Sequence, residues 1–389
     1  MAYVAGGMRR RDPDEQHRAS TPLELLFDLT FVVAVATVAA ELAHDLVENH
    51  LGHGLVSYAM LFFAIWWAWM NFSWFASAYD CDDALYRVMT AVQMAGVLVL
   101  AAGVEPAFEE KDFKTAVVGY VIMRIAMVGQ WWRASLGDPE GRVTARRYAV
   151  GILVVQVLWV LRLWLPSDLG LLSFLVLVAA ELAVPMWAER TRRTTWHAEH
   201  IAERYGLFTI IVLGESVLAS SNAVSADFAD GGLTVDLALL AVGGLALLFG
   251  LWWIYFLHET GEALRLRRDL DFLWGYSHYL IFAAAAAVGA GLEAATEYGI
   301  HHVEASATLL AGALAGAVSV YLVMVALVHG RLSPSHRPSL AQAVGGAVAL
   351  FVIAFTVAES SLPLAVLLFA CVVMVLVGLG SRRVVRDAP

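Results

Sequence analysis

The feature that most limits the fold of this chain is a series of twelve apolar stretches, each long enough to cross a bilayer as a helix. A crossing needs about 20 apolar residues. Charged residues make up only 15% of the 389 residues, whereas soluble domains carry charge on about a quarter. The sequence therefore predicts an all-α polytopic integral membrane protein. The expected membrane helices are residues 23–46, 54–78, 84–107, 113–133, 146–166, 169–188, 201–222, 235–258, 270–293, 304–329, 340–358 and 363–381.

The distribution of arginine between these stretches predicts the orientation. Arginine collects on the cytoplasmic side of membrane proteins. The even-numbered connections contain Arg87, Arg133, Arg142, Arg146, Arg147, Arg190, Arg192, Arg193, Arg265, Arg267, Arg268, Arg331 and Arg337. The odd-numbered connections have Lys111 and Lys114 as their basic residues, and one of them, from Ser220 to Asp236, is polar and acidic. We therefore expect a multi-pass protein with both termini in the cytoplasm.

Two stretches of the chain are related to each other. TPLELLFDLTFVVAVATVAAELAHDL, from Thr21 to Leu46, aligns without gaps with HIAERYGLFTIIVLGESVLASS, from His200 to Ser221. The alignment pairs Glu24 with Glu203, Thr30 with Thr209 and Thr37 with Ser216, and later matches include Trp66-Trp67 with Trp252-Trp253. Matches that keep their order are typical of a duplication. The prediction is two parallel six-helix repeats, with the following boundaries: cytoplasmic tail 1–22, first repeat 23–188, cytoplasmic linker 189–200, second repeat 201–381 and cytoplasmic tail 382–389.

Acidic residues inside the apolar stretches are the first candidates for function. A carboxylate at mid-membrane costs a few kcal/mol and persists where it has a partner, water or a function. Glu24 and Glu203 occupy matching positions near the cytoplasmic boundary, and we interpret them chiefly as scaffold. Asp28 and Glu215 have no counterpart in the other repeat and are the preferred functional acids. By its depth in the membrane, Arg124 is the leading candidate partner for Glu215.

Other polar residues of the apolar stretches remain open to two interpretations. Thr30 and Thr37 in one repeat, and Thr209 and Ser216 in the other, form matching stripes that serve either close helix packing or the lining of a polar pathway. His278 lies within a later apolar stretch and is a further candidate ligand or relay group.

No metal site is predicted, although two histidines are weak candidates. His197 and His200 are spaced three apart and are followed by Glu203, and these residue types suit zinc. Each three-residue step, however, drifts about 60° around a helix, so the three side chains do not face one ion. Capping and interfacial hydrogen bonding explain the spacing equally well.

Several functional classes find no support in the sequence. The net charge of −10 is spread over the connections and argues against nucleic-acid binding, which needs a concentrated basic face. Cys81 and Cys371 are too few for a disulfide framework. Walker, dinucleotide-binding, nucleophile-elbow and metalloprotease motifs are absent, which speaks against an enzyme and names no cofactor.

The motif-bearing segments resemble the bacterial low temperature requirement protein A (LtrA) family. The resemblance rests on LELLFDLTFVVAVATVAAELAH at Leu23 to His44, ELAVP at Glu181 to Pro185, HIAERYGLFTIIVLGESVLA at His200 to Ala219, and YSHYLIF at Tyr276 to Phe282. It implies a many-helix protein of the bacterial cytoplasmic (inner) membrane, and it carries Glu24, Asp28, Glu203, Gly214 and Glu215 as motif positions. It supplies no substrate.

Two functions fit these residues. The leading hypothesis is a transporter or channel for a cation, proton or small solute, with the opening helices of the two repeats facing each other across a polar pathway. The alternative is an intramembrane enzyme, or a protein that binds a cofactor, lipid or other apolar ligand in a cavity between the repeats. The pathway or the cavity can be formed by one chain or by a homodimer.

Overall fold

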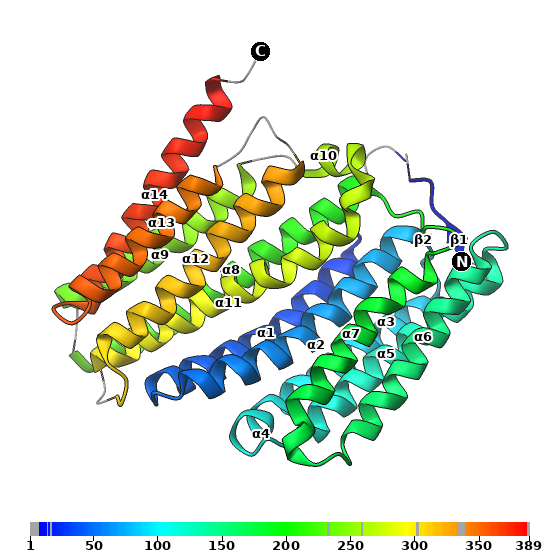
Figure 1. The fold of residues 1–389 in the computed structure, drawn as a ribbon, viewed down its shortest axis with the longest axis horizontal. Helices are drawn as coiled ribbons and strands as arrows, with labels where there is room; N and C mark the ends of the chain where they lie inside the picture. Colours follow the sequence, from blue (N-terminus) through cyan, green and yellow to red (C-terminus); the bar gives the residue numbers. More distant parts are fainter. Residues whose placement is uncertain are drawn as a thin grey trace. The chain divides into compact units, whose positions relative to one another are not determined.

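The computed structural model describes residues 8–13, 15, 18–231, 234–257, 260–300, 303–332 and 339–386. The fold is all-α (Figure 1). Both predicted tails, 1–22 and 382–389, lie partly outside the described residues. The helices are α1 (Pro22–Val47), α2 (Leu51–Ala78), α3 (Ala84–Ala102), α4 (Val104–Glu109), α5 (Lys114–Gly137), α6 (Arg142–Arg162), α7 (Gly170–Ala188), α8 (Ala198–Gly231), α9 (Val235–Phe256), α10 (Thr260–Leu266), α11 (Asp271–Ile300), α12 (Ala307–Leu332), α13 (Leu340–Val357) and α14 (Leu362–Arg386).

Each of the twelve predicted segments lies on a helix, and the structure confirms a polytopic α-helical membrane protein. Ten spans in the described part of the chain are long and apolar enough to cross a bilayer. Helices α5 and α8 are not among them. These two helices carry Arg124 and Arg204, two of the buried arginines of the protein, and such residues lower the mean hydropathy of a helix.

Several helix boundaries differ from the prediction by a few residues, and two of the differences change the helices themselves. The segment 84–107 was expected to be one helix, but α3 ends at Ala102, and the short α4 after it contains Pro106. Proline cannot donate the backbone hydrogen bond that would continue α3. The polar connection from Ser220 to Asp236 is also shorter than expected, because α8 continues to Gly231. Alanines in that stretch favour a helix even where the sequence is not apolar.

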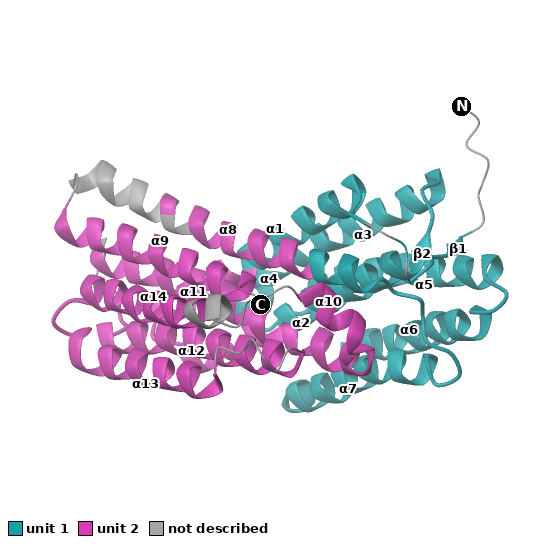
Figure 2. Cartoon of the chain, turned by 90° about the horizontal axis from the view of Figure 1, so that it is seen from above, with its two compact units in different colours: residues 1–37, 60–204 teal, residues 38–59, 205–389 magenta. Residues whose placement is uncertain are grey.

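The chain forms two compact units, drawn in different colours in Figure 2. Unit 1 contains residues 1–37 and 60–204, and unit 2 contains residues 38–59 and 205–389. The boundaries fall within α1, α2 and α8. The division into two six-helix repeats is not tested by these units and stays a prediction.

In unit 1, α3, α5, α6 and α7 pack against one another in chain order. The contact of α3 with α5 depends on glycine, because a Cβ on Gly119 would overlap the backbone nitrogen of Leu100. Small residues let membrane helices approach this closely. The N-terminal segment joins the unit through β1 (Arg9–Arg10), which pairs antiparallel with β2 (Tyr79–Asp80) directly after α2. This pairing places Arg18 near the end of α2.

In unit 2, α9 packs against α14, and α11, α12 and α13 form a row of neighbours. Gly243 of α9 faces the backbone of Leu367 in α14, and a Cβ there would lie 2.9 Å from the Leu367 nitrogen. The short α10 and the 3₁₀ turn η2 (Arg268–Leu270) precede α11. This end of the unit holds the start of α11 close to the end of α12.

Candidate functional site

The central feature of unit 1 is an ion pair between Asp28 of α1 and Arg204 of α8. Arg204 donates from Nη2 to Asp28 Oδ1 at 2.5 Å and from Nε to Oδ2 at 3.1 Å. Both side chains are 0% exposed. A bidentate pair of this kind is the strongest geometry that arginine and a carboxylate form. The pair joins the two motif-bearing helices at a point without access to solvent.

Glu24 extends the ion pair by one helical turn. Its Oε1 lies 3.4 Å from Arg204 Nη1 and 3.2 Å from His200 Nε2. Its Oε2 accepts a hydrogen bond from the backbone N–H of Thr21, and the Thr21 hydroxyl accepts one from the Glu24 N–H. This reciprocal pair is a capping box that begins α1. Glu24 therefore both caps a helix and shares Arg204 with Asp28.

Arg18 completes this cluster from the N-terminal side. Its guanidinium lies 3.7 Å from Glu24 and donates to the carbonyl oxygens of Ser77 and Ala76. These carbonyls belong to the last turn of α2, which has no helical partner for them. Burial lowers the pKa of Arg18 to about 10, so the side chain remains a cation at neutral pH. We name Arg18, Glu24, Asp28, His200 and Arg204 the α1–α8 cluster.

Aromatic side chains separate the α1–α8 cluster from water. Trp69 donates its indole N–H to Asp28 Oδ1 at 2.7 Å. The Phe72 ring lies under the Arg204 guanidinium, with its centroid 5.9 Å from Cζ. Phe27 and Phe31 are fully buried beside them. In such low-dielectric surroundings the attraction between opposite charges is strong, and an unpaired charge is correspondingly costly.

A second buried carboxylate, Glu181 of α7, collects donors from three other helices. Its partners are Arg124 Nη2 at 3.0 Å, Trp67 Nε1 at 2.9 Å, Tyr120 Oη at 2.7 Å, Gln156 Nε2 at 2.9 Å and Trp159 Nε1 at 3.3 Å. Glu181 and Arg124 are 0% and 1% exposed. We name these six residues the Glu181 cluster. It ties α2, α5, α6 and α7 of unit 1 to a single carboxylate.

Some polar atoms of the Glu181 cluster have no partner among the described residues. They are Arg124 Nε, Arg124 Nη1 and Gln156 Oε1. Tyr120 and Trp159 also line a cavity of about 30 Å³. Its lining is mostly apolar, and neither Arg124 nor Gln156 belongs to it, so the cavity does not supply these atoms with a partner. A cofactor or lipid does not fit in it.

The structure brings together three of the residues that the sequence suggested, Glu24, Asp28 and His200. The interpretation of Glu24 as a scaffold residue at the membrane boundary was incomplete. Its side chain is only 3% exposed, and it shares the Arg204 guanidinium with Asp28. Glu203, its predicted equivalent, is exposed and accepts a hydrogen bond from the Ser20 N–H at 3.3 Å. The two matched glutamates therefore have different surroundings.

The expected pairing of Arg124 with Glu215 was wrong. Arg124 binds Glu181, which lies on α7, whereas Glu215 lies on α8. Depth along a helix constrains the height of a side chain in the membrane but does not say which helix lies next to it. Glu215 is half-buried in unit 2, where it interacts electrostatically with Glu293 of α11.

The four hydroxyl residues of the predicted stripes donate within their own helices. Thr30, Thr37, Thr209 and Ser216 each donate to the carbonyl oxygen four residues earlier. This arrangement satisfies a membrane helix without a polar pathway. The same hydroxyl oxygens keep lone pairs that can accept, so the pathway hypothesis is not tested by these bonds.

The two candidate histidines outside the α1–α8 cluster, His278 and His197, have structural partners. In unit 2, His278 Nε2 lies 3.0 Å from the Tyr255 hydroxyl and Nδ1 lies 2.7 Å from the Trp274 carbonyl oxygen. In unit 1, His197 Nε2 lies 2.7 Å from the Glu15 carbonyl oxygen, and Nδ1 accepts from the His200 N–H. His197 and His200 thus connect the N-terminal segment to α8, which agrees with the interfacial interpretation of their spacing.

Within the described residues, one group of side chains is close enough to hold a metal ion, namely Asp45, Glu48 and His50. These residues lie at the end of α1 in unit 2 and do not include His197 or His200. Two of the three are exposed, and Asp45 also binds His53 at 3.0 Å. A surface acidic group of this kind is common without an ion.

Sequence reasoning missed Arg204, Arg18 and the roles of the tryptophans. Arg204 follows His200 by four residues, so the two share a helix face, and this spacing could have been noticed. In the sequence, Trp66-Trp67 of α2 stood out only by the match with Trp252-Trp253. Trp67 and Trp69 also donate to Glu181 and Asp28, which no residue spacing indicates.

Together these features define a multi-pass α-helical membrane protein with two ionic clusters buried among its helices. The chain belongs to the bacterial low temperature requirement A protein (LtrA) family, which it matches over residues 19–378. It is also similar to an uncharacterized protein of Rhizobium meliloti (strain 1021), with 27% identity over 257 residues. That alignment covers 64% of this chain and 60% of the relative.

Proposed function

We propose that this protein is a transporter or channel for a cation, proton or small solute, with the α1–α8 cluster as its functional centre. The observation that carries the proposal is the solvent-free pair of Asp28 with Arg204, linked to Glu24 and His200. Ionisable residues inside the membrane that pair with one another often mark ion pathways and proton relays. The pair also joins the opening helices of the two proposed repeats, 23–188 and 201–381.

The chemistry of the cluster suits a switch. Arg204 is shared by two carboxylates, Asp28 at 2.5 Å and Glu24 at 3.4 Å. A proton or cation that neutralises Asp28 removes the stronger partner and leaves Glu24 to hold Arg204. Glu24 in turn contacts His200, whose imidazole is neutral at neutral pH because burial lowers its pKa to about 4. Neutralisation of Asp28 would thus change how α1 is held against α8.

Flux measurements test this proposal. Purified protein would be reconstituted into liposomes of phosphatidylethanolamine and phosphatidylglycerol, and proton, potassium and sodium flux recorded with entrapped dyes. We expect a higher ion flux in vesicles with wild type than in empty vesicles. The flux rate of Asp28→Asn should be at least about tenfold lower than that of wild type, which corresponds to about 1.4 kcal/mol. Glu199→Gln, which removes an exposed carboxylate from the first turn of α8, is the matched control.

Two results would count against the proposal. Vesicles that contain folded wild type but show no flux of these ions or of small solutes would remove the transport hypothesis. Equal rates for Asp28→Asn and wild type would remove the assigned centre.

The alternative, an intramembrane enzyme or ligand-binding protein, draws on the unpartnered atoms of Arg124 and Gln156. The cavity of about 30 Å³ that Tyr120 and Trp159 line is too small for a cofactor or lipid, and neither Arg124 nor Gln156 lines it. We therefore rank this function second. Mass spectrometry of gently purified protein that revealed a stoichiometric cofactor would reverse the order.

A further inference from the structure

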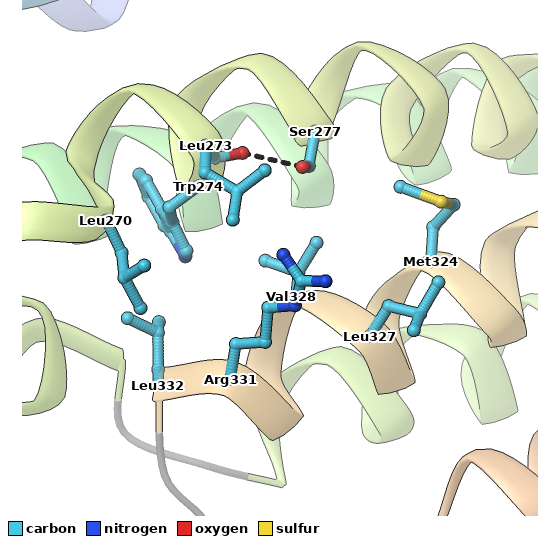
Figure 3. A pocket seen from close by; sticks show the side chains of 9 residues that line it. All are labelled: Leu270, Leu273, Trp274, Ser277, Met324, Leu327, Val328, Arg331 and Leu332. Atoms are coloured by element: carbon cyan, nitrogen blue, oxygen red, sulfur yellow. Dashed lines mark hydrogen bonds between the residues drawn. The ribbon is translucent and has the colours of Figure 1, made fainter.

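A separate pocket lies in unit 2, where the start of α11 meets the end of α12 (Figure 3). Its volume is about 200 Å³, far larger than the cavity beside the Glu181 cluster. The lining is apolar except for Ser277 and Arg331, and it consists of Leu270, Leu273, Trp274, Ser277, Met324, Leu327, Val328, Arg331 and Leu332. None of these residues belongs to the α1–α8 cluster.

Two polar side chains of this pocket, Arg331 and Trp274, offer hydrogen-bond donors. Arg331 is exposed at the end of α12, and among the described residues no carboxylate lies within ion-pair distance of it. Two other arginines of this part of unit 2 have acidic neighbours. Arg265 of α10 lies 4.0 Å from Glu262, and Arg267, between α10 and η2, lies 3.1 Å from Asp269. Figure 3 shows the guanidinium of Arg331 directed into the space between the two helices.

Trp274 supplies a second unused donor. Its side chain is 2% exposed, and its indole nitrogen has no hydrogen-bond partner in the described part of the protein. The indole nitrogen edge faces the pocket in Figure 3. A buried N–H without a partner costs about 1–3 kcal/mol, so an acceptor in the pocket would be favoured. The Ser277 hydroxyl donates to the Leu273 carbonyl oxygen at 2.6 Å and is therefore occupied as a donor.

We propose that this pocket binds an anionic phospholipid. Arginine recognises a phosphate with parallel N–H donors, and the Trp274 N–H is available to a phosphate or ester oxygen. Leu273, Met324 and Leu327 would contact the first part of an acyl chain. A volume of about 200 Å³ holds only part of a lipid. The remainder would run along the apolar outer surface of α11 and α12, where Leu280 and Val320 are 42% exposed.

The charge and the lining favour a lipid over other occupants. Arg331 and Trp274 are donors, and no carboxylate is among the described lining residues, so the pocket favours an anion over a cation. The apolar wall gives no advantage to a small soluble anion. Basic pockets between membrane helices are known to bind anionic headgroups, with about 1 kcal/mol from each arginine or lysine near the surface. The site is independent of the transport proposal, because it shares no residue with the α1–α8 cluster.

Native mass spectrometry of the full chain in detergent tests the site with two probes, dioleoylphosphatidylglycerol and dioleoylphosphatidylcholine. We expect wild type to bind phosphatidylglycerol about fivefold more tightly, the ratio expected from one arginine. Arg331→Gln should abolish the preference, and Arg331→Lys should retain most of it. Trp274→Phe should weaken binding of both lipids about threefold, as expected for the loss of one hydrogen bond.

Arg265→Gln is the matched control, because it removes an exposed arginine on the adjacent helix α10 without touching the pocket lining. Size-exclusion profiles and thermal unfolding show that each variant is folded. Equal loss of preference in Arg265→Gln and Arg331→Gln would overturn the proposal, since it would indicate a diffuse charge effect. Competition of inorganic phosphate with phosphatidylglycerol would also overturn it, in favour of a site for soluble anions.

Discussion

At the scale of single residues, three of the buried carboxylates in the described part of the chain, Glu24, Asp28 and Glu181, lie inside the helical bundle of unit 1. Each is matched by an arginine, with Arg204 for Asp28, Arg124 for Glu181, and Arg18 and Arg204 beside Glu24. A buried pair contributes little net stability, but removal of one partner leaves an expensive charge. Removal of one charged member of a pair should therefore lower the free energy of unfolding more than removal of both members.

A double-mutant cycle on Asp28 and Arg204 checks this. We expect Arg204→Gln to lower the free energy of unfolding by about 3–5 kcal/mol, because Asp28 is left as an unpaired buried charge. Asp28→Asn combined with Arg204→Gln should recover a large part of that loss. Denaturant titration of wild type, both single variants and the double variant in mild detergent gives the four free energies of unfolding. Their difference is the interaction energy between Asp28 and Arg204. Additive effects of the two substitutions would show that the side chains do not interact.

At the scale of helices and their ends, Asp83 joins two functions at the start of α3. Its carboxylate accepts from the Tyr86 N–H at 2.8 Å as the N-cap and binds Arg133 of α5 at 2.5 Å. Burial raises the pKa of Asp83, but the Tyr86 N–H and Arg133 outweigh it and hold the pKa below its usual value of 3.8. The ionised form is thus favoured in the folded protein.

The sign of the resulting pH dependence follows from this lowered pKa. The stabilisation by Asp83 is present above the unfolded-state pKa and is lost as the pH falls through the folded one. Asp83→Asn keeps an N-cap acceptor and loses the ion pair, so we expect a constant deficit in melting temperature from pH 5 to 8. The deficit should shrink below pH 3.8, the usual pKa of the group. Thermal melts across this range give the result, and a deficit independent of pH would exclude an ionic origin.

Asp83→Ala serves as the comparison, because it removes both the cap and the ion pair. Loss of an N-cap costs about 1 kcal/mol at any pH. Its deficit should therefore exceed that of Asp83→Asn and persist in acid.

The helices themselves were readable from the sequence, and their neighbours were not. Runs of apolar residues located every long helix because the bilayer demands about 20 such residues. The break after Ala102 and the length of α8 escaped this reasoning, since neither depends on hydropathy. The partner of Arg124 was also out of reach, because Glu181 lies 57 residues away on a helix that only the packing of unit 1 brings close.

At the scale of the whole molecule, the orientation in the membrane remains a prediction from arginine. The connection after α2 is expected in the cytoplasm and the connection after α4 outside. Single cysteines at exposed Asp82 and Glu110, in a background of Cys81→Ala and Cys371→Ala, test this. A membrane-impermeant maleimide should label Glu110→Cys in intact cells and Asp82→Cys only after permeabilisation. The reverse pattern would invert the topology.

The two tryptophans of α2 impose a mechanical constraint on unit 1. Trp67 and Trp69 are two residues apart, so they leave the helix about 200° from each other, and each holds a different buried carboxylate. A slide of α2 by one residue, about 1.5 Å, would break both bonds together. These two hydrogen bonds therefore oppose both rotation and sliding of residues 60–78 of α2 relative to α1 and α7. A conformational change in unit 1 must either move residues 60–78 together with Asp28 and Glu181 or first break the hydrogen bond between Trp69 and Asp28.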